Sequence, residues 1–241
     1  MNTLYPLDDF AQHFNFIYAN TDELKRESYK LRSQVKRTDF NHSSTNQVRL
    51  DIDQYDAHSH HILLQNKDTK RFVATVRIIE PPVNNPKKLL PIEEHNAENI
   101  WISGAAIHTL PRRSYSEMSR LSINPNYLPN NEAHCNHEKI RLGLCLASYS
   151  LARLLFHQYM FAKLTVDQFK KLRASGLLLE QTNELIMGQD DRAIFYLNLE
   201  SGINSTNPTY ELQQHILNEI AHQLNKPVVK DSSVGDVSSA R

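Results

Sequence analysis

The chain has 241 residues, enough for one large domain or two small ones, and a single domain is the default expectation. Hydrophobic residues make up 40%, charged residues 22% and aromatic residues 8%, which excludes collagen-like, disordered and coiled-coil proteins. Lysine plus arginine and aspartate plus glutamate number 27 each, so no overall charge favours nucleic acid or an anionic membrane.

Targeting signals and cysteines indicate a cytoplasmic protein. The start, MNTLYPLDDF, lacks a basic region followed by an apolar stretch, and no apolar run is long enough to span a membrane. The two cysteines, Cys135 and Cys145, are too few for a disulfide framework, which is consistent with a reducing compartment.

The first third of the chain predicts a strand, a helix and a hairpin. Residues 14–19 alternate as in a strand, and Asn20-Thr-Asp-Glu opens a helix reaching about Ser33. HHILLQ and KRFVATVRIIE form an antiparallel hairpin that ends at Pro81 and Pro82. Five prolines then fall within about 81–113, which is too many for regular structure, so this segment is interpreted as a functional insertion.

The remainder alternates strands and helices. We expect a strand over SEMSRLSIN, a long helix over 137–157, a strand over AKLTV, a helix over DQFKKLRAS ended by Gly176, strands over LLLEQTNELIM and RAIFYLNLE, and a last helix over 210–224. This order predicts an α/β (α+β) fold, with helices on both faces of a mixed sheet, in one domain over 1–227. The polar tail 228–241 is expected to be disordered.

Charged residues interrupt the strand-like and helix-like patterns in three places. They are Arg32 in KLRSQV, the aspartates of DIDQYDAH, and Arg77, Glu117 and Arg120 in TVRIIE and SEMSRLSI. Charges in half-buried strands are costly unless they are paired, and surface salt bridges are the simple alternative explanation. A regular strand places Glu117 and Arg120 on opposite faces, whereas a bulge would change that.

Together these segments resemble a known family. Leu31-Arg32, Asp53-Gln-Tyr-Asp56, Val76-Arg77 and Glu117-Met-Ser-Arg120 are similar to the charged signature of the acyl-homoserine-lactone synthases. Their relatives include the N-acyl amino acid synthases and the acyltransferases of PEP-CTERM/exosortase systems, and the last branch is the most similar. All have the Gcn5-related N-acyltransferase (GNAT) fold, so the resemblance implies a mostly antiparallel central sheet flanked by helices.

The resemblance also implies an activity and roles for residues. The reaction would move a fatty acyl group from an acyl carrier protein thioester to the amine of an amino acid or similar small acceptor. Glu117 would be the general base and Arg120 would act beside it, while the substrate-binding residues would be Arg32, Asp53, Asp56, Arg77, Phe40 and Trp101. Trp101, with the aliphatics of NIWISGAAI, would cover an acyl tunnel or belong to the core. A backbone N–H beside a strand bulge near Leu121–Asn124 would stabilise the oxyanion.

Two departures from the family pattern bear on the substrates. SQVKRTDF lacks the aromatic residues that shape the S-adenosylmethionine pocket of the lactone synthases, since Phe40 is the only ring nearby. The coenzyme A signature is only echoed by IRLGLCLA, in which Gly143 lies deep in the apolar run. Both departures favour a carrier-protein donor and an N-acyl amine product, with acyl-coenzyme A still open as donor and no bound cofactor expected.

Several alternatives remain open from the sequence. They are an acyl-homoserine-lactone synthase that uses S-adenosylmethionine, and a catalytically idle acyl-binding module. The histidine groups around His58, His60 and His61 and around His134, Cys135 and His137 lack the spacing of a known zinc finger, so no metal site is predicted. Basic residues could dock the acidic carrier protein or form a solvated surface; they are Arg112, Arg113, Lys139, Arg141 and Arg153.

Overall fold

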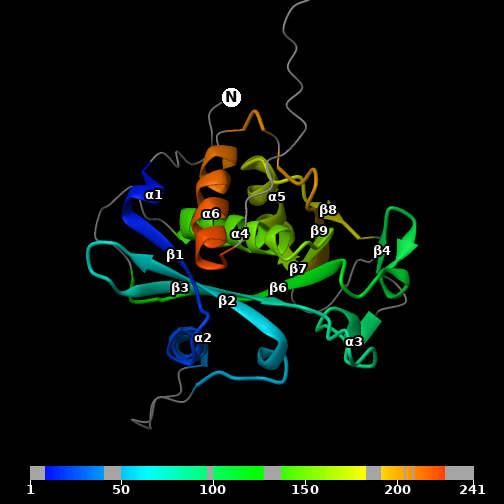
Figure 1. Cartoon of the computed structure of the whole chain (residues 1–241), viewed down its shortest axis with the longest axis horizontal. Coiled ribbons are helices and arrows are strands. Elements are labelled where there is room, and N and C mark those ends of the chain that lie inside the picture. Colours follow the sequence, from blue (N-terminus) through cyan, green and yellow to red (C-terminus); the bar gives the residue numbers. More distant parts are fainter. Residues whose placement is uncertain are drawn as a thin grey trace, which may run out of the picture.

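A computed structural model describes most of the chain (Figure 1). The described residues are 9–40, 50–96, 100–127, 137–182, 191–203, 205–207 and 209–225. The tail 228–241, His134 and Cys135 lie outside these ranges, so the predictions made for them are not tested.

A seven-stranded sheet forms the centre of the molecule, in the order β1-β2-β3-β6-β7-β9-β8. Its strands are β1 Phe14–Tyr18, β2 Ser59–Asn66, β3 Phe72–Ile79, β6 Tyr115–Ile123, β7 Tyr159–Thr165, β8 Glu180–Gln181 and β9 Arg192–Asn198. Neighbouring strands are antiparallel except β6 and β7, which are parallel. The predicted mixed, mostly antiparallel sheet is therefore confirmed.

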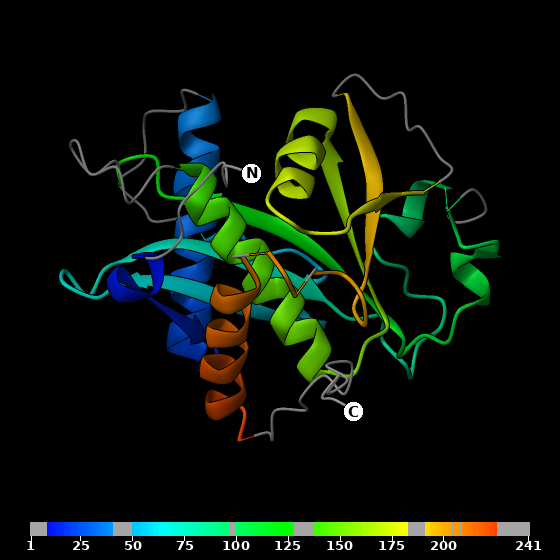
Figure 2. The same cartoon turned by 90° about the horizontal axis from the view of Figure 1, so that it is seen from above.

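Helices cover both faces of this sheet (Figures 1 and 2). The described helices are α1 Phe10–His13, α2 Asp22–Phe40, α3 Glu93–Asn96, α4 His137–Leu154, α5 Val166–Ala174 and α6 Thr209–Gln223. In Figure 1, α2 lies below the sheet, whereas α4, α5 and α6 lie above it. None of the described helices is long and apolar enough to cross a membrane.

Two apolar clusters on opposite faces follow from the strand alternation. On β3, Ala74, Val76 and Ile78 join the large core beneath α4 and α6, whereas Ile79 joins a second cluster on the α2 side. That second cluster contains Tyr115 of β6 and the buried isoleucines of residues 81–113. The proline-rich insertion therefore covers the part of this face that α2 leaves open.

The insertion has more regular structure than its prolines predicted. It contains α3, a two-stranded sheet of β4 Trp101–Ile102 and β5 Ala105–Ala106, and a short 3₁₀ helix over Ile107–Thr109. Alternation along this small sheet buries Ile102 and exposes Trp101. The prolines limit the length of each element without preventing the segment from packing.

Local sequence signals explain several element ends. Thr165 and Gln168 form a reciprocal capping box at the start of α5, and Gly176 takes a positive φ of 97° just after that helix ends. The helix predicted to end near Ser33 continues to Phe40, since neither glycine nor proline interrupts KLRSQVKRTDF. The strand predicted over 177–187 is only β8 within its described part.

Candidate active site

A β-bulge in β6 organises the charged side chains. In the pairing with β3, Arg77 faces Ser119 and Thr75 faces Ser122, so two β6 residues lie opposite the single residue Val76. The extra residue falls at Arg120–Leu121, and Arg120 has a left-handed φ of 52°. The bulge begins one residue before the predicted position at Leu121–Asn124.

The bulge changes which side chains share a face. Arg120 donates to Asp53, which also binds Arg77, so Arg120 projects to the same side of the sheet as Glu117 and Ser119. Leu121 packs against the large core on the other side, to which Met118 belongs. A regular strand would place Glu117 and Arg120 on opposite faces. They lie on the same face because the bulge interrupts the alternation.

Arg32 forms the buried half of a charge cluster. Its side chain is 1% exposed and projects from α2. Nη1 and Nη2 donate to the two oxygens of Asp56 at 2.6 and 3.1 Å, and Nε donates to Oδ2 of Asp51 at 3.2 Å. This two-pronged contact fixes the guanidinium plane against the loop before β2.

Arg77 and Arg120 complete the cluster from the sheet. Arg77 Nη1 donates to Oδ1 of Asp53 at 2.5 Å and to Oδ1 of Asp56 at 3.0 Å. Arg120 Nη2 donates to Oδ2 of Asp53 at 3.1 Å, and its side chain is 39% exposed. Three arginines thus meet three aspartates, so the cluster is close to neutral and only Arg120 is accessible to a ligand.

Asp53 and Asp56 of the cluster stay ionised. Burial raises the pKa of Asp53, but hydrogen bonds and charge from Arg77 outweigh burial and hold this pKa at about 2. The pKa of Asp56 is lowered in the same way, since Arg32 outweighs burial. Burial lowers the pKa of the neighbouring His61 to about 3, so its imidazole is neutral. Neither Asp53 nor Asp56 therefore suits a general base near neutral pH.

Glu117 has the opposite electrostatic environment. Its side chain lies under the insertion and is nearly fully buried, and Oε2 accepts a hydrogen bond from the backbone N–H of Ile92 at 3.0 Å. Burial raises its pKa to about 8, against the opposing effects of the Ile92 N–H and the Arg77 charge. A carboxyl group with this pKa can take up and release a proton near neutral pH.

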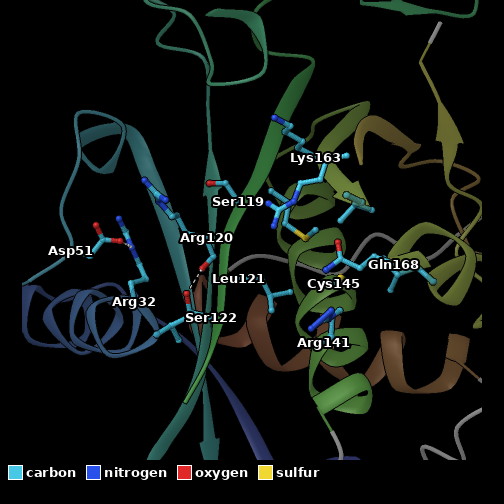
Figure 3. Close-up of a pocket in the computed structure, with 15 residues that line it drawn as sticks. Arg32, Asp51, Ser119, Arg120, Leu121, Ser122, Arg141, Cys145, Lys163 and Gln168 are labelled. Atoms are coloured by element: carbon cyan, nitrogen blue, oxygen red, sulfur yellow. Dashed lines mark hydrogen bonds and ion pairs between the residues drawn. The ribbon is translucent and has the colours of Figure 1, made fainter. Parts of the chain in front are cut away.

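A cleft of about 430 Å³ opens where β6 and β7 separate (Figure 3). The two strands pair only as far as Met118 and Ala162. Beyond that point the cleft is lined by Ser119, Arg120, Leu121 and Ser122 of β6, Lys163 and Leu164 of β7, and side chains of α2, α4, α5 and β9. Glu117 lies next to Met118 but is not itself part of the lining.

Cations dominate the lining of this cleft. Arg141 of α4, Lys163 of β7 and Arg192 of β9 join Arg32 and Arg120 there. Among the described residues that line the cleft, Asp51 is the one acidic residue, and it already binds Arg32. Arg141 also has a buried Nε without a hydrogen-bond partner in the described part of the chain. The cleft is therefore suited to an anionic ligand.

Other residues singled out in the sequence lie elsewhere. Trp101 is 41% exposed and does not join the charge cluster, and its place at an acyl tunnel stays a prediction. Phe40 is the last residue of α2, and its side chain is outside what the structure describes. Gly143 is buried in α4, where a Cβ atom would come within 2.9 Å of the Phe10 ring. This glycine permits close packing of α1 and does not open toward a ligand.

The basic residues considered for carrier docking do not form one surface. Lys139 is buried, and Arg112 turns inward to bind the carboxylate of Glu93 at 2.8 Å. Arg141 lines the cleft. The sequence suggested neither Lys163 nor Arg192 as a site residue, because each is a single charge at one position of an otherwise ordinary strand.

The described histidines and Cys145 do not form a reactive centre. Across the described ranges, no group of three His, Cys, Asp or Glu side chains could hold a metal ion. His60 binds Tyr18 and Glu80, whereas His61 contacts Ser28 on the other side of β2. Burial raises the pKa of Cys145 to about 12, so this cleft thiol stays protonated and is not a nucleophile.

Comparison with known proteins identifies the class. Residues 31–133 match the family model described as an acetyltransferase (GNAT) domain. This segment contains the whole charge cluster and the bulged strand. This match covers less than half of the chain, and it supports an acyltransferase with a GNAT domain in that segment.

Solved structures place the fold among the autoinducer synthases. The acyl-homoserine-lactone (AHL) synthase LasI matches with a TM-score of 0.55 and 19% identity over 78% of this chain and 90% of that chain. The CoA-dependent AHL synthase BjaI, solved with S-adenosylmethionine and isopentyl-CoA, matches with a TM-score of 0.54 and 13% identity over 90% of each chain. FeeM, an N-acyl amino acid synthase from uncultured soil microbes, matches with a TM-score of 0.50 and 11% identity over 79% of this chain and 94% of that chain.

Among curated proteins, the sequence search finds no match. The resemblance to autoinducer and N-acyl amino acid synthases is thus confirmed at the level of fold and domain. The closer resemblance to the exosortase-associated branch stays a prediction.

Proposed function

We propose that the protein is an N-acyltransferase that moves a fatty acyl group from an acyl carrier protein thioester to the amine of an amino acid or similar small acceptor. The observation that carries this proposal is a cationic cleft between β6 and β7 that adjoins Glu117, a buried carboxyl group with a pKa near 8. A carboxyl group of this kind beside an anion-binding cleft matches the needs of an amine acceptor and a phosphate-bearing acyl donor.

In the proposed reaction, Glu117 acts as general base. The acceptor ammonium must lose a proton before its nitrogen attacks the thioester carbonyl, and the ionised Glu117 carboxylate receives that proton. Since Glu117 does not line the cleft, we assign one bridging water to this transfer. The C–N bond forms first and gives a tetrahedral intermediate with an oxyanion. Its collapse breaks the C–S bond, and the leaving carrier thiolate takes up the proton that the attacking nitrogen loses.

The bulged strand supplies the environment for the tetrahedral intermediate. Pairing between β6 and β7 ends at Met118, so the β6 backbone beyond it faces the cleft instead of a strand partner. A backbone N–H at the bulge would donate to the oxyanion, which is worth several kcal/mol in a site that excludes water.

Arg120 is the residue that we assign to an acceptor carboxylate. It lines the cleft, and Asp53 is its partner at one guanidinium nitrogen while its side chain stays partly exposed. Arg32, Arg77, Asp53 and Asp56 then hold Arg120 and the loop before β2 in place. This division of roles supports an amino acid as the acceptor.

The donor arm is assigned to the α4 side of the cleft. Carrier protein presents its acyl group on a phosphopantetheine arm, whose phosphodiester needs one or two cations and no glycine cradle. Arg141 supplies such a cation, whereas Gly143 is filled by the Phe10 ring and leaves no room for a diphosphate. This arrangement favours carrier protein over coenzyme A.

Product analysis tests the proposed function. The purified protein is given long-chain acyl carrier protein or acyl-coenzyme A, a pool of amino acids and S-adenosylmethionine, and the products are examined by mass spectrometry. We expect an acylated amino acid from the carrier-protein donor. An acyl lactone with methylthioadenosine, or acyl binding without any product, would contradict the proposal.

Arg141→Gln is expected to weaken donor binding selectively. A charge-assisted hydrogen bond to phosphate contributes about 1.5–3 kcal/mol, so KM for acyl carrier protein should rise at least about tenfold with kcat within about threefold. Lys170→Gln, on an exposed position of α5 outside the cleft, is the matched control. An unchanged KM in steady-state kinetics would remove Arg141 from the donor site.

A further inference from the structure

The turn that covers Glu117 is held by a second buried network. Leu90 N–H donates to Oε2 of Glu93 at 2.7 Å, and the Glu93 N–H donates back to the Leu90 carbonyl at 2.9 Å. These reciprocal bonds close residues 90–93 into a tight turn. Ile92, whose N–H binds Glu117, lies inside this turn.

Arg112 fixes the turn from the far end of the insertion. Its Nη1 donates to both oxygens of Glu93 at 2.8 and 3.0 Å, and its Nη2 donates to the Lys88 carbonyl at 2.6 Å. The Glu93 side chain is 1% exposed. A carboxylate buried to this extent needs its cation, so loss of Arg112 would release the turn.

Strand β6 holds this turn at two points. Tyr115 and Glu117 are two residues apart on β6, so they project to the same face. The Tyr115 hydroxyl donates to Oε1 of Glu93 at 2.9 Å, while Glu117 accepts from Ile92. The turn is therefore seated in a defined register on β6, and that register brings the Ile92 N–H to the Glu117 carboxylate.

We propose that Arg112 and Glu93 are positioning residues that act through the Ile92 N–H to set the proton affinity of Glu117. The inference rests on the proposed function, in which Glu117 is the base. An N–H aimed at a carboxylate stabilises its ionised form, whereas burial under the same insertion disfavours that form. The insertion thus both shields Glu117 from water and supplies the donor that keeps it ionisable.

Other charged groups around Glu117 act in known directions. Arg77 on β3 favours the ionised carboxylate, while Glu93 and Glu94 of α3 oppose it. Tyr55, which joins the apolar cluster on the same face, and Tyr115 are phenols with raised pKa values, so both are neutral. Removal of Arg112 would loosen the Ile92 N–H and leave Glu93 uncompensated, and both changes raise the pKa of Glu117.

The test compares pH profiles of kcat/KM for wild type, Arg112→Met and Arg112→Lys. For Arg112→Met we expect the acid limb to move up by about one pH unit, giving about a tenfold loss at pH 7 and full recovery at pH 10. Arg112→Lys keeps the positive charge but loses the several hydrogen bonds of the guanidinium group. Its profile should lie between those of the wild type and Arg112→Met. Lys87→Met removes an exposed cation of the same insertion and should follow the wild type.

Two outcomes would overturn the inference. One is an Arg112→Lys or Arg112→Met profile that superimposes on the wild type, and the other is an equal loss at every pH, which indicates a structural role alone. A ¹³C NMR titration of labelled glutamate reports the Glu117 pKa without any assay, and Arg112→Lys is the variant used if Arg112→Met does not fold. Full activity of Glu117→Gln would instead overturn the proposed function itself.

Discussion

Glu117→Gln is expected to lower the rate of acyl transfer by about 100- to 10,000-fold at pH 8, the usual contribution of a general base. Glutamine keeps the size of the side chain and can still accept the Ile92 N–H, but it cannot take a proton from the acceptor. Donor binding should be unchanged, because Glu117 does not line the cleft. Single-turnover release of carrier thiol in the presence of the amine measures this rate.

The same substitution should make the folded protein more stable at alkaline pH, although it lowers the rate of acyl transfer. The folded-state pKa near 8 lies above the ordinary value of 4.5, so folding retains a proton that the unfolded chain releases. The stability that this group contributes is fully present below pH 4.5 and is lost as pH rises to about 8. We expect Glu117→Gln to be more stable than the wild type at pH 9, by on the order of a few kcal/mol.

Urea denaturation at pH 5 and pH 9 measures that difference. Glu200→Gln removes an exposed carboxylate that does not act on Glu117, so it is the control and should change stability little at either pH. An inactive Glu117→Gln protein that is also less stable at pH 9 would indicate that the substitution damages the fold, and the loss of activity would then say nothing about a base.

Asp56→Asn is expected to cost about 3–5 kcal/mol of folding free energy, because it leaves two buried arginines without a shared anion. Asp56 accepts from both Arg32 and Arg77 and also caps the Asp53 N–H at 2.8 Å. Its pKa is lowered in the folded state, so its contribution is present above the ordinary value of 3.8 and is lost as pH falls below it.

Chemical denaturation at pH 7 measures this loss, with Asp68→Asn in the exposed β2–β3 turn as the control. A loss of less than about 1 kcal/mol, within the range of a surface ion pair, would show that the cluster contributes little to folding. Activity would then be the only property for which these charges are needed.

Much of the fold could be predicted because the local patterns are strong. The hairpin of β2 and β3, the long α4 and the charged residues inside strands all have clear periodicity. The resemblance to the lactone synthases implied that Arg32, Asp53 and Arg77 cluster, and the structure brings these residues together. The alternation of residues could not predict the face on which Arg120 lies, because a single extra residue in β6 reverses that face.

The rest of the site depends on tertiary contacts that a sequence pattern does not contain. Arg112 could equally face solvent or Glu93, and only the packing of the insertion decides between them. Lys163 becomes a cleft residue because β6 and β7 separate beside it. Trp101 is exposed because its small sheet buries the alternate residue, Ile102.

The pH dependence of kcat/KM shows directly whether Glu117 is the base of an acyl transfer to an amine. Thiol release from acyl carrier protein is followed from pH 6 to pH 10 with two acceptors whose amines have different pKa values. We expect an acid limb near pH 8 that both acceptors share and that Glu117→Gln abolishes. Acid limbs that move with the pKa of each acceptor amine, with no limb common to the two acceptors, would contradict the role of Glu117 as the base.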